Sequence, residues 1–228
     1  MQRLVLFDID GTLATDGGAS RQSFAAALHE VYGYEGELGR YDFSGRTDPQ
    51  IAHMVLADAG FDSPSIEERL PRLWVRYLAG LALRATGDRV RALSGIPALV
   101  ARLAEIPGVT LALLTGNIEP GARLKLAPPD LNRYFPFGAF GSDSPRREEL
   151  PPIAIARAFE RSGCRFLLRE VVIIGDSIYD IRCGLPHGAT TIAVASGKTP
   201  IDRLRAEHPD YLFENAADTE RLIDAVVG

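Results

Sequence analysis

The chain has few cysteines, few lysines and no long apolar segment. Its two cysteines, Cys164 and Cys183, show no paired spacing, which argues against a disulfide framework or a zinc site. Polar and charged residues interrupt every apolar run before it reaches the length of a membrane span, so we expect no transmembrane helix. The first apolar run, at residues 4–7, is too short for a signal peptide. We therefore expect a reduced, cytoplasmic protein with no membrane partner.

Positive charge is also scarce. Lys and Arg together number 25 against 30 Asp and Glu, which gives a formal net charge of −5, and Lys125 and Lys198 are the only two lysines. This balance argues against a broadly basic surface, so no nucleic-acid partner is expected. The overall composition, 46% hydrophobic and 24% charged, is that of an ordinary globular protein.

Short apolar runs that alternate with helical patterns predict an α/β fold. The expected strands lie at residues 4–7, 110–114, 171–174 and 191–194, with weaker candidates at 137–140 and 211–213. Helical patterns at 97–106, 151–162, 200–208 and 219–227 separate most of these strands. Alternating strands and helices predict a doubly wound parallel sheet that is covered on both faces.

The region from residue 16 to residue 89 breaks this alternation. It contains no convincing strand and three helical patterns, the second of which is expected to begin with Asp48 as its N-cap and Pro49 at its first position. We therefore predict an α/β core formed by residues 1–15 and 90–228, with a helical cap formed by residues 16–89.

Acidic and hydroxyl residues follow three of the expected strands. The strand ends read Asp8-Ile9-Asp10-Gly11-Thr12, Thr115-Gly116-Asn117 and Gly175-Asp176-Ser177-Ile178-Tyr179-Asp180. Ligands of open α/β folds bind beyond the carboxyl ends of the strands, so we expect these three segments to share one site. Taken alone, each also has a plain structural explanation as a turn or a helix cap.

The three strand ends taken together predict phosphoryl-transfer chemistry. Acids from two strands would hold a hard divalent cation, for which oxygen ligands and Mg²⁺ are the natural combination. The hydroxyl of Thr115 and the backbone amides after it would hold the oxygens of an anion. A metal, an anion cradle and a free carboxylate are typical of phosphoryl transfer.

This ordered set of motifs resembles that of the haloacid dehalogenase-like hydrolase superfamily. It is most similar to the phosphoglycolate phosphatase and β-phosphoglucomutase-like branch, in which a helical cap is inserted after the first motif. The resemblance covers nearly the whole chain. It implies that Asp8 is the nucleophile and forms an aspartyl-phosphate. It also implies that Asp10 protonates the leaving alkoxide and then deprotonates the attacking water.

The resemblance also implies how the metal and the phosphate are held. Mg²⁺ would be bound by the carboxylate of Asp8, the backbone carbonyl of Asp10 and the carboxylate of Asp176. Asp180 would lie in or near the second shell of the metal, next to the residues that bind it. The phosphoryl oxygens would be bound by Thr115, Gly116 and Asn117.

One motif departs from the family's pattern. The family normally places a lysine at the start of the helix before the last motif strand, whereas this chain has two adjacent arginines there, Arg146 and Arg147. We predict that Arg147 faces the phosphate, because a guanidinium suits the charge of a phosphoryl group. Arg146, Lys198 and Lys125 are its rivals in that order. Lys125 ranks last because its helix is expected to climb away from the sheet edge. The competing explanation makes Arg146 and Arg147 solvated surface residues.

The predicted cap carries one further candidate. Its loop at residues 43–49 contains Gly45, Arg46 and Thr47 just before a helix. Such a turn would present Arg46 to an acidic substrate, so we predict that Arg46 helps to select the substrate. An ordinary turn between helices with a solvated arginine is an equal alternative.

These residues together predict a Mg²⁺-dependent phosphatase that acts, as a monomer or homodimer, on a small phosphorylated metabolite such as phosphoglycolate or a sugar phosphate. A haloacid dehalogenase is disfavoured because Asp10 supplies a second acid, and a phosphonate hydrolase because the cap has no lysine. A phosphomutase shares every catalytic residue and stays open. A non-enzymatic binding protein on the same fold is the remaining alternative. No Gly-x-Gly-x-x-Gly follows the first strand, so a dinucleotide-binding protein is set aside.

Overall fold

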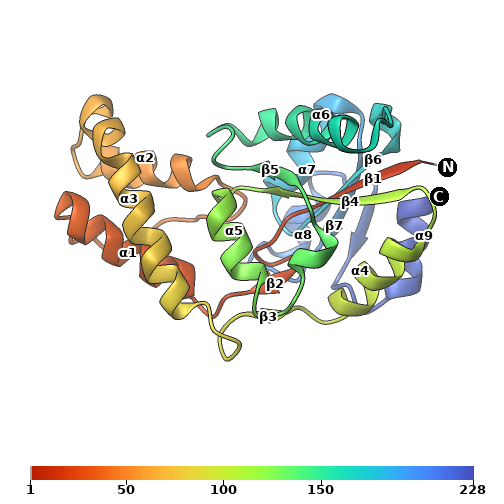
Figure 1. Ribbon diagram of the computed structural model, residues 1–228, viewed down its shortest axis with the longest axis horizontal. Helices are drawn as coiled ribbons and strands as arrows, with labels where there is room; N and C mark the ends of the chain where they lie inside the picture. Colours follow the sequence, from red (N-terminus) through yellow and green to blue (C-terminus); the bar gives the residue numbers. More distant parts are fainter. Residues whose placement is uncertain (1) are drawn as a thin grey trace.

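The computed structural model describes residues 2–228 and consists of an α/β core with a helical insertion (Figure 1). The core is built on a six-stranded parallel sheet with the strand order β5-β4-β1-β6-β7-β8. Its strands are β1 (Arg3–Phe7), β4 (Val109–Thr115), β5 (Gly138–Phe140), β6 (Val171–Gly175), β7 (Thr190–Val194) and β8 (Tyr211–Phe213). The predicted parallel α/β fold is confirmed, and strands form at both the strong and the weak candidate positions.

Both faces of the sheet are covered by helices, which explains why the central strands are unbroken apolar runs in the sequence. In β1, Val5 and Phe7 pack on one face with α4 (Ile96–Glu105) and α9 (Thr219–Val227). Leu4 and Leu6 pack on the opposite face with α6 (Leu150–Ser162), and Figure 1 shows α6 and the α4–α9 pair on opposite sides of the sheet. The other core helices are α5 (Glu119–Leu126), α7 (Ile178–Gly184) and α8 (Ile201–Arg205).

The insertion has its own hydrophobic core. It is formed by α1 (Ala19–Tyr32), α2 (Asp48–Asp58) and α3 (Ser63–Arg84), and side chains such as Phe24, Leu73 and Tyr77 are almost completely buried between these helices. The chain enters and leaves the insertion through an antiparallel ribbon of β2 (Ala14–Thr15) and β3 (Arg91–Ala92). The ribbon lies next to the predicted domain boundaries, whose exact positions stay a prediction.

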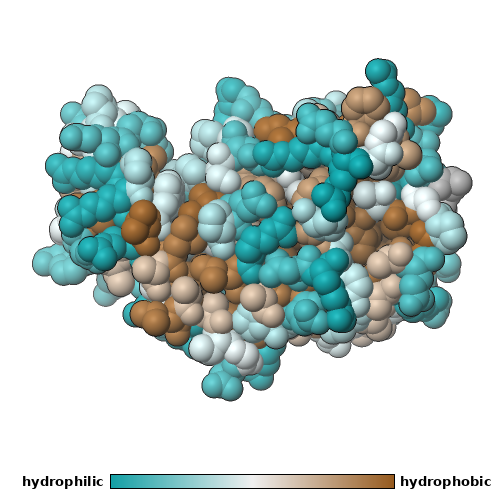
Figure 2. Space-filling view, viewed as in Figure 1, coloured by the Kyte–Doolittle hydropathy of each residue, from teal (hydrophilic) through white to brown (hydrophobic). Residues whose placement is uncertain are grey.

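The insertion contacts the core at the start of α2. The N-cap of α2 is Thr47, whose hydroxyl accepts a hydrogen bond from Gln50 N at 3.2 Å, so the prediction of Asp48 as the cap is wrong by one residue. The Asp48 carboxylate is engaged elsewhere, because it accepts from the backbone N of Ile118 in the core at 2.9 Å. Figure 2 shows a notch between the insertion and the core. Within residues 2–228, no helix combines the length and the apolar character that crossing a membrane requires.

Candidate active site

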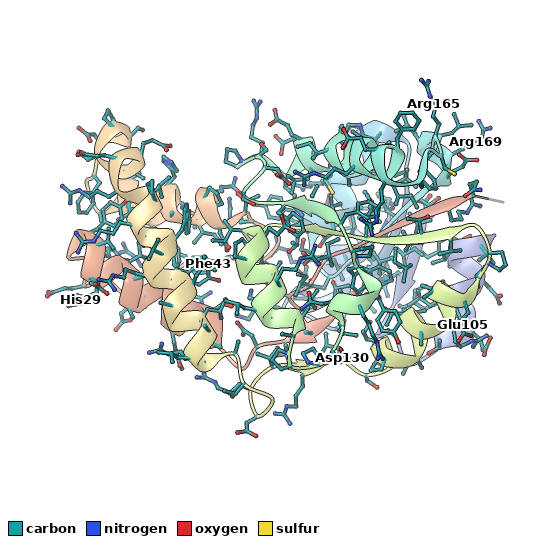
Figure 3. All side chains as sticks on the ribbon, in the orientation of Figure 1. His29, Phe43, Glu105, Asp130, Arg165 and Arg169 are labelled. Carbon is teal, nitrogen blue, oxygen red and sulfur yellow. The ribbon has the colours of Figure 1, made fainter. Side chains whose placement is uncertain are left out.

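The three strand ends meet at a pocket of about 540 Å³ that is lined by both the core and the insertion. Phe43, labelled in Figure 3, belongs to the insertion side of this pocket. The structure places eight of the nine sequence-predicted site residues in the pocket wall, namely Asp8, Asp10, Arg46, Thr115, Gly116, Asn117, Arg147 and Asp176. The ninth, Asp180, is buried next to Asp8 and Asp176. Its volume suits a small metabolite.

Three buried carboxylates lie together at this edge of the sheet. Asp8, Asp176 and Asp180 each place one oxygen within 4.8 Å of the other two, and none is more than 5% exposed. Asp8 continues directly from β1, and its backbone N donates to Ile174 O at 3.0 Å. Burial raises the pKa of Asp8, although the neighbouring Arg147 opposes this shift. Three clustered carboxylates are a donor set that fits a hard divalent cation.

Asp176 has the least compensated carboxylate of the three. Among the described residues its one hydrogen-bond partner is Thr12, whose hydroxyl donates to Oδ1 at 3.3 Å. Burial, followed by the charges of the neighbouring carboxylates, raises the pKa of Asp176 well above its ordinary value. Gly11 and Gly197 pack against this carboxylate so closely that a Cβ atom would lie 2.5 Å and 1.7 Å, respectively, from its Oδ2. The surrounding loops therefore hold Asp176 in one place.

Arg147 is buried beside the proposed nucleophile. It lies in the 3₁₀ turn before α6 and is only 4% exposed, so the explanation as a solvated surface residue does not hold for it. Its Nη2 lies 3.1 Å from Asp8 Oδ1 and donates to Asp180 Oδ1 and to Leu114 O. Its Nη1 donates to Gly45 O in the insertion at 3.1 Å. One guanidinium thus ties two carboxylates of the site to two backbone segments.

Lys125 forms a second buried network. Its side chain is 3% exposed, and its Nζ donates to both oxygens of Asp10, at 2.9 and 2.7 Å, and to Asn117 Oδ1 at 2.6 Å. Asn117 Nδ2 donates in turn to Asp10 Oδ2 at 2.8 Å and to Thr115 Oγ1 at 2.9 Å. Burial alone would lower the pKa of Lys125, but Asp10 and other nearby acids raise it, so the ammonium stays charged.

The expectation that the helix carries Lys125 away from the sheet edge is wrong. The Cα–Cβ bonds of a helix tilt toward its N-terminus, and the N-terminus of α5 lies at the sheet edge. The long side chain of Lys125 therefore reaches back to Asp10, across 115 positions of sequence.

The buried carboxylates at this edge are only partly paired within the chain. Arg147 contacts Asp8 and Asp180, and among residues 2–228 no ion pair reaches Asp176. The clustered carboxylate oxygens and the single hydrogen-bond partner of Asp176 therefore fit a bound metal ion.

The segment from residue 43 to residue 49 of the insertion lies against the phosphate-binding candidates. A Cβ atom at Gly116 would lie 2.0 Å from the carbonyl oxygen of Arg46, and Asp48 N donates to Gly116 O at 2.7 Å. Burial raises the pKa of Asp48 to about 6. Arg46 is half-buried and lines the pocket, with its guanidinium 5.3 Å from the centroid of the Tyr179 ring.

The remaining rival cations are exposed. Arg146 forms an ion pair with Glu149 on the surface, whereas Lys198 lies at the pocket in the loop after β7. Sequence reasoning named Lys198 in this loop but missed two of its neighbours: Ser196 Oγ donates to Gly11 O at 2.7 Å, and Gly197 packs on Asp176. The Ser-Gly pair directly after the expected strand at residues 191–194 was the signal that could have found them.

Comparison with known proteins gives the family. A model described as haloacid dehalogenase-like hydrolase matches residues 5–184, and a second model of HAD-hydrolase-like proteins matches residues 150–219. The chain therefore belongs to the haloacid dehalogenase-like hydrolase family, as the sequence motifs predicted.

Its similarity to individual proteins is lower. The chain is 30% identical over 199 residues to the tyrosine-protein kinase PtkA of Mycobacterium tuberculosis, an alignment that covers 86% of this chain and 62% of the relative's length. It is 25% identical over 229 residues to a phosphoglycolate phosphatase of Vibrio vulnificus, covering 99% of this chain and 96% of that one.

Solved structures share the fold. A hydrolase from Pseudomonas syringae superimposes with a TM-score of 0.73 at 19% identity and 99% coverage of both chains. CbbY from Rhodobacter sphaeroides, solved in complex with phosphate, superimposes with a TM-score of 0.71 at 16% identity and 96% coverage of both chains.

Proposed function

We propose that this chain is a Mg²⁺-dependent phosphatase that hydrolyses a small phosphorylated metabolite through an aspartyl-phosphate on Asp8. The observation that carries this proposal is the setting of Asp8. Its carboxylate is buried between the guanidinium of Arg147 and two further carboxylates, beside a pocket that Asp10 and Thr115 also line. A nucleophile, a proton-transfer group and a cation site thus converge on one pocket.

The family and the acid cluster support a metal requirement. The proposed ligands are the carboxylates of Asp8 and Asp176 and the backbone carbonyl of Asp10, with Asp180 next to them. Bound Mg²⁺ would offset the charge that develops on the phosphoryl oxygens during transfer. Magnesium suits this site because it prefers hard oxygen ligands and is held by one or two carboxylates.

The chain's own residues account for both halves of the reaction. A carboxylate oxygen of Asp8 attacks phosphorus as the bond from phosphorus to the ester oxygen breaks, and Asp10 gives its proton to the leaving oxygen. Asp10 then takes a proton from water as this water attacks the phosphorus of the aspartyl-phosphate. That second attack releases inorganic phosphate and restores Asp8. Thr115 and the amides after it bind the phosphoryl oxygens.

The insertion supports a small substrate. Its segment at residues 43–49 lies directly on Gly116, so the insertion forms one side of a pocket of about 540 Å³, a volume that favours a small ester over a folded phosphoprotein. Arg46 lines the pocket, and its Nε donates to the backbone oxygen of Asp42 at 3.2 Å. Its remaining donors are placed to meet an anionic part of the substrate. The similarity to a protein named phosphoglycolate phosphatase points to the same size class.

Release of inorganic phosphate from a panel of esters tests the proposal. The panel contains phosphoglycolate, sugar phosphates, nucleotides and phosphoamino acids, each assayed with Mg²⁺ and with excess EDTA. We expect turnover of at least one small ester that EDTA abolishes. Asp8→Asn should abolish turnover without unfolding the protein, because asparagine has the same shape but no nucleophilic oxygen. Asp202→Asn, the same change in an exposed surface ion pair, should leave turnover intact.

Two results would contradict the proposal. One is steady turnover by Asp8→Asn, and the other is an absence of phosphate release from the whole panel by folded, Mg²⁺-loaded protein. Isomerisation of a sugar phosphate without steady phosphate release would instead identify the phosphomutase alternative.

A further inference from the structure

The feature that the family's motifs leave unexplained is the buried lysine of α5. Lys125 is one of two lysines in a chain whose other 23 cationic side chains are arginines, and it is 3% exposed. A buried ammonium is costly unless it is paired, so a lysine at this position requires a specific set of acceptors.

The geometry points to Lys125 as a positioning residue that holds the ionised carboxylate of Asp10 in place for the step in which it takes a proton from water, which rests on the proposed phosphatase function. An ammonium has three donors, and the three acceptors within 2.9 Å of Nζ are Asp10 Oδ1, Asp10 Oδ2 and Asn117 Oδ1. No donor is left for a phosphate oxygen. Lys125 therefore acts through Asp10 and does not itself bind the substrate.

Asp10 needs such support. Its side chain is 45% exposed and lies in the loop after β1, where a carboxylate held by solvent alone samples several rotamers. Lys125 Nζ donates hydrogen bonds to both of its oxygens, and Asn117 Nδ2 donates another to Oδ2 at 2.8 Å. The proton-transfer group is thereby fixed in a single orientation before the substrate arrives.

The same network connects Asp10 to the phosphate-binding end of β4. Asn117 contacts Lys125, Asp10 and the hydroxyl of Thr115 at once. Lys125 thus sets the distance between the group that transfers the proton and the group that holds the phosphoryl oxygens. An error of about 1 Å in that distance is enough to slow an enzyme about 100-fold.

A competing role for Lys125 is to neutralise the acids of the insertion. The charges of Asp16 and Asp48 also act on its ammonium, although less strongly than that of Asp10. A residue that only neutralised these acids would affect turnover whether or not Asp10 carried a charge. The two roles therefore give different results in a variant that lacks the Asp10 carboxylate.

A double-mutant cycle on the phosphatase reaction separates the two roles. We expect Lys125→Met to lower kcat about 10- to 100-fold with KM changed less than about threefold, because the phosphate contacts remain. In the Asp10→Asn background the same change should lower kcat no further, because its target is already absent. Arg123→Met removes a cation from the same helix that does not line the pocket, and kcat should stay near that of the wild type. Equal loss of kcat from Lys125→Met with and without the Asp10 carboxylate would overturn the proposal.

A second measurement does not depend on activity. Lysine-selective ¹⁵N labelling gives signals from only two side chains, those of Lys125 and Lys198. We expect one ammonium signal that is protected from exchange, that disappears in Lys125→Met, and that shifts or loses protection in Asp10→Asn. A protected signal that is unchanged by Asp10→Asn would refute the contact. If the wild type released no phosphate while this signal behaved as expected, the proposed function would fail and the Lys125–Asp10 contact would stand.

Discussion

Replacing Gly11 by alanine tests whether the position of Asp176 controls catalysis. Gly11 has a φ of +86°, and an added Cβ would lie 2.5 Å from Asp176 Oδ2 and 2.9 Å from Gly197 Cα. An ordinary contact between a carbon and an oxygen is about 3.4 Å, so the carboxylate has to move by about 1 Å. The backbone of Gly197 prevents the alanine from moving the other way.

The magnitude of the effect follows from two separate costs. Any residue other than glycine in the left-handed region costs about 1–2 kcal/mol in the free energy of unfolding. Gly163, at the end of α6, has a φ of +69° and no atom within 4 Å of an added Cβ, so Gly163→Ala carries this cost alone. Gly11→Ala adds the displacement of Asp176, which should lower kcat about 100-fold and raise the Mg²⁺ concentration needed for half-maximal activity.

The assay compares the two alanine variants under identical conditions. Urea denaturation gives the free energy of unfolding of each, and phosphate release over a range of Mg²⁺ concentrations gives kcat and the metal requirement. If kcat of Gly11→Ala stayed within about threefold of that of Gly163→Ala, the placement of Asp176 would not matter for turnover. The argument from the close packing of Gly11 would then be refuted.

Two further substitutions probe the buried charges. Arg147→Met should lower the free energy of unfolding, measured in urea, by about 3–5 kcal/mol because it leaves buried carboxylates unpaired. The control Arg146→Met, which removes an exposed ion pair, should change the free energy of unfolding by less than about 1 kcal/mol. Equal effects of the two variants would contradict the burial argument. Burial raises the pKa of Asp48 from 3.8 to about 6, so its stabilising contribution is present below about pH 4 and is lost as the pH rises through 6. Asp48→Asn should therefore raise the free energy of unfolding at pH 7.5 by about 1–3 kcal/mol relative to the wild type. It should also reduce the difference in the free energy of unfolding between pH 4 and pH 7. If this pH dependence were the same in the variant and the wild type, the assignment to Asp48 would be wrong.

Local sequence patterns were enough to predict the elements and the strand ends. The strand at residues 4–7 is unbroken and apolar because both faces of the sheet are covered, and the acids that follow it belong to the sheet's carboxyl edge for the same reason. Local patterns of this kind contain no information on the distances between segments that are far apart in the sequence. The contact of Asp48 with Ile118 joins two segments 70 residues apart and depends on how the insertion packs on the core.

The surroundings of Lys125 show why side-chain contacts between distant segments could not be predicted from the sequence. Its rank below Arg147 followed from counting helical rise, which places the backbone but not the end of a long side chain. Both cations are buried, but the acceptors that they contact are arranged differently. Arg147 needs a planar fork because its acceptors belong to four different segments, those of Asp8, Gly45, Leu114 and Asp180.

Lys125 needs only a compact charge because its three acceptors converge from two side chains, those of Asp10 and Asn117. An arginine at residue 125 would bring five donors to a buried place with three acceptors, and a lysine at residue 147 would bring three donors to a place with four acceptors. The family's usual lysine is therefore absent from residue 147 without any loss of positive charge near Asp8. A chain with a net charge of −5 thus buries Lys125 and Arg147 at the one edge of the sheet where we propose that a phosphorylated substrate binds.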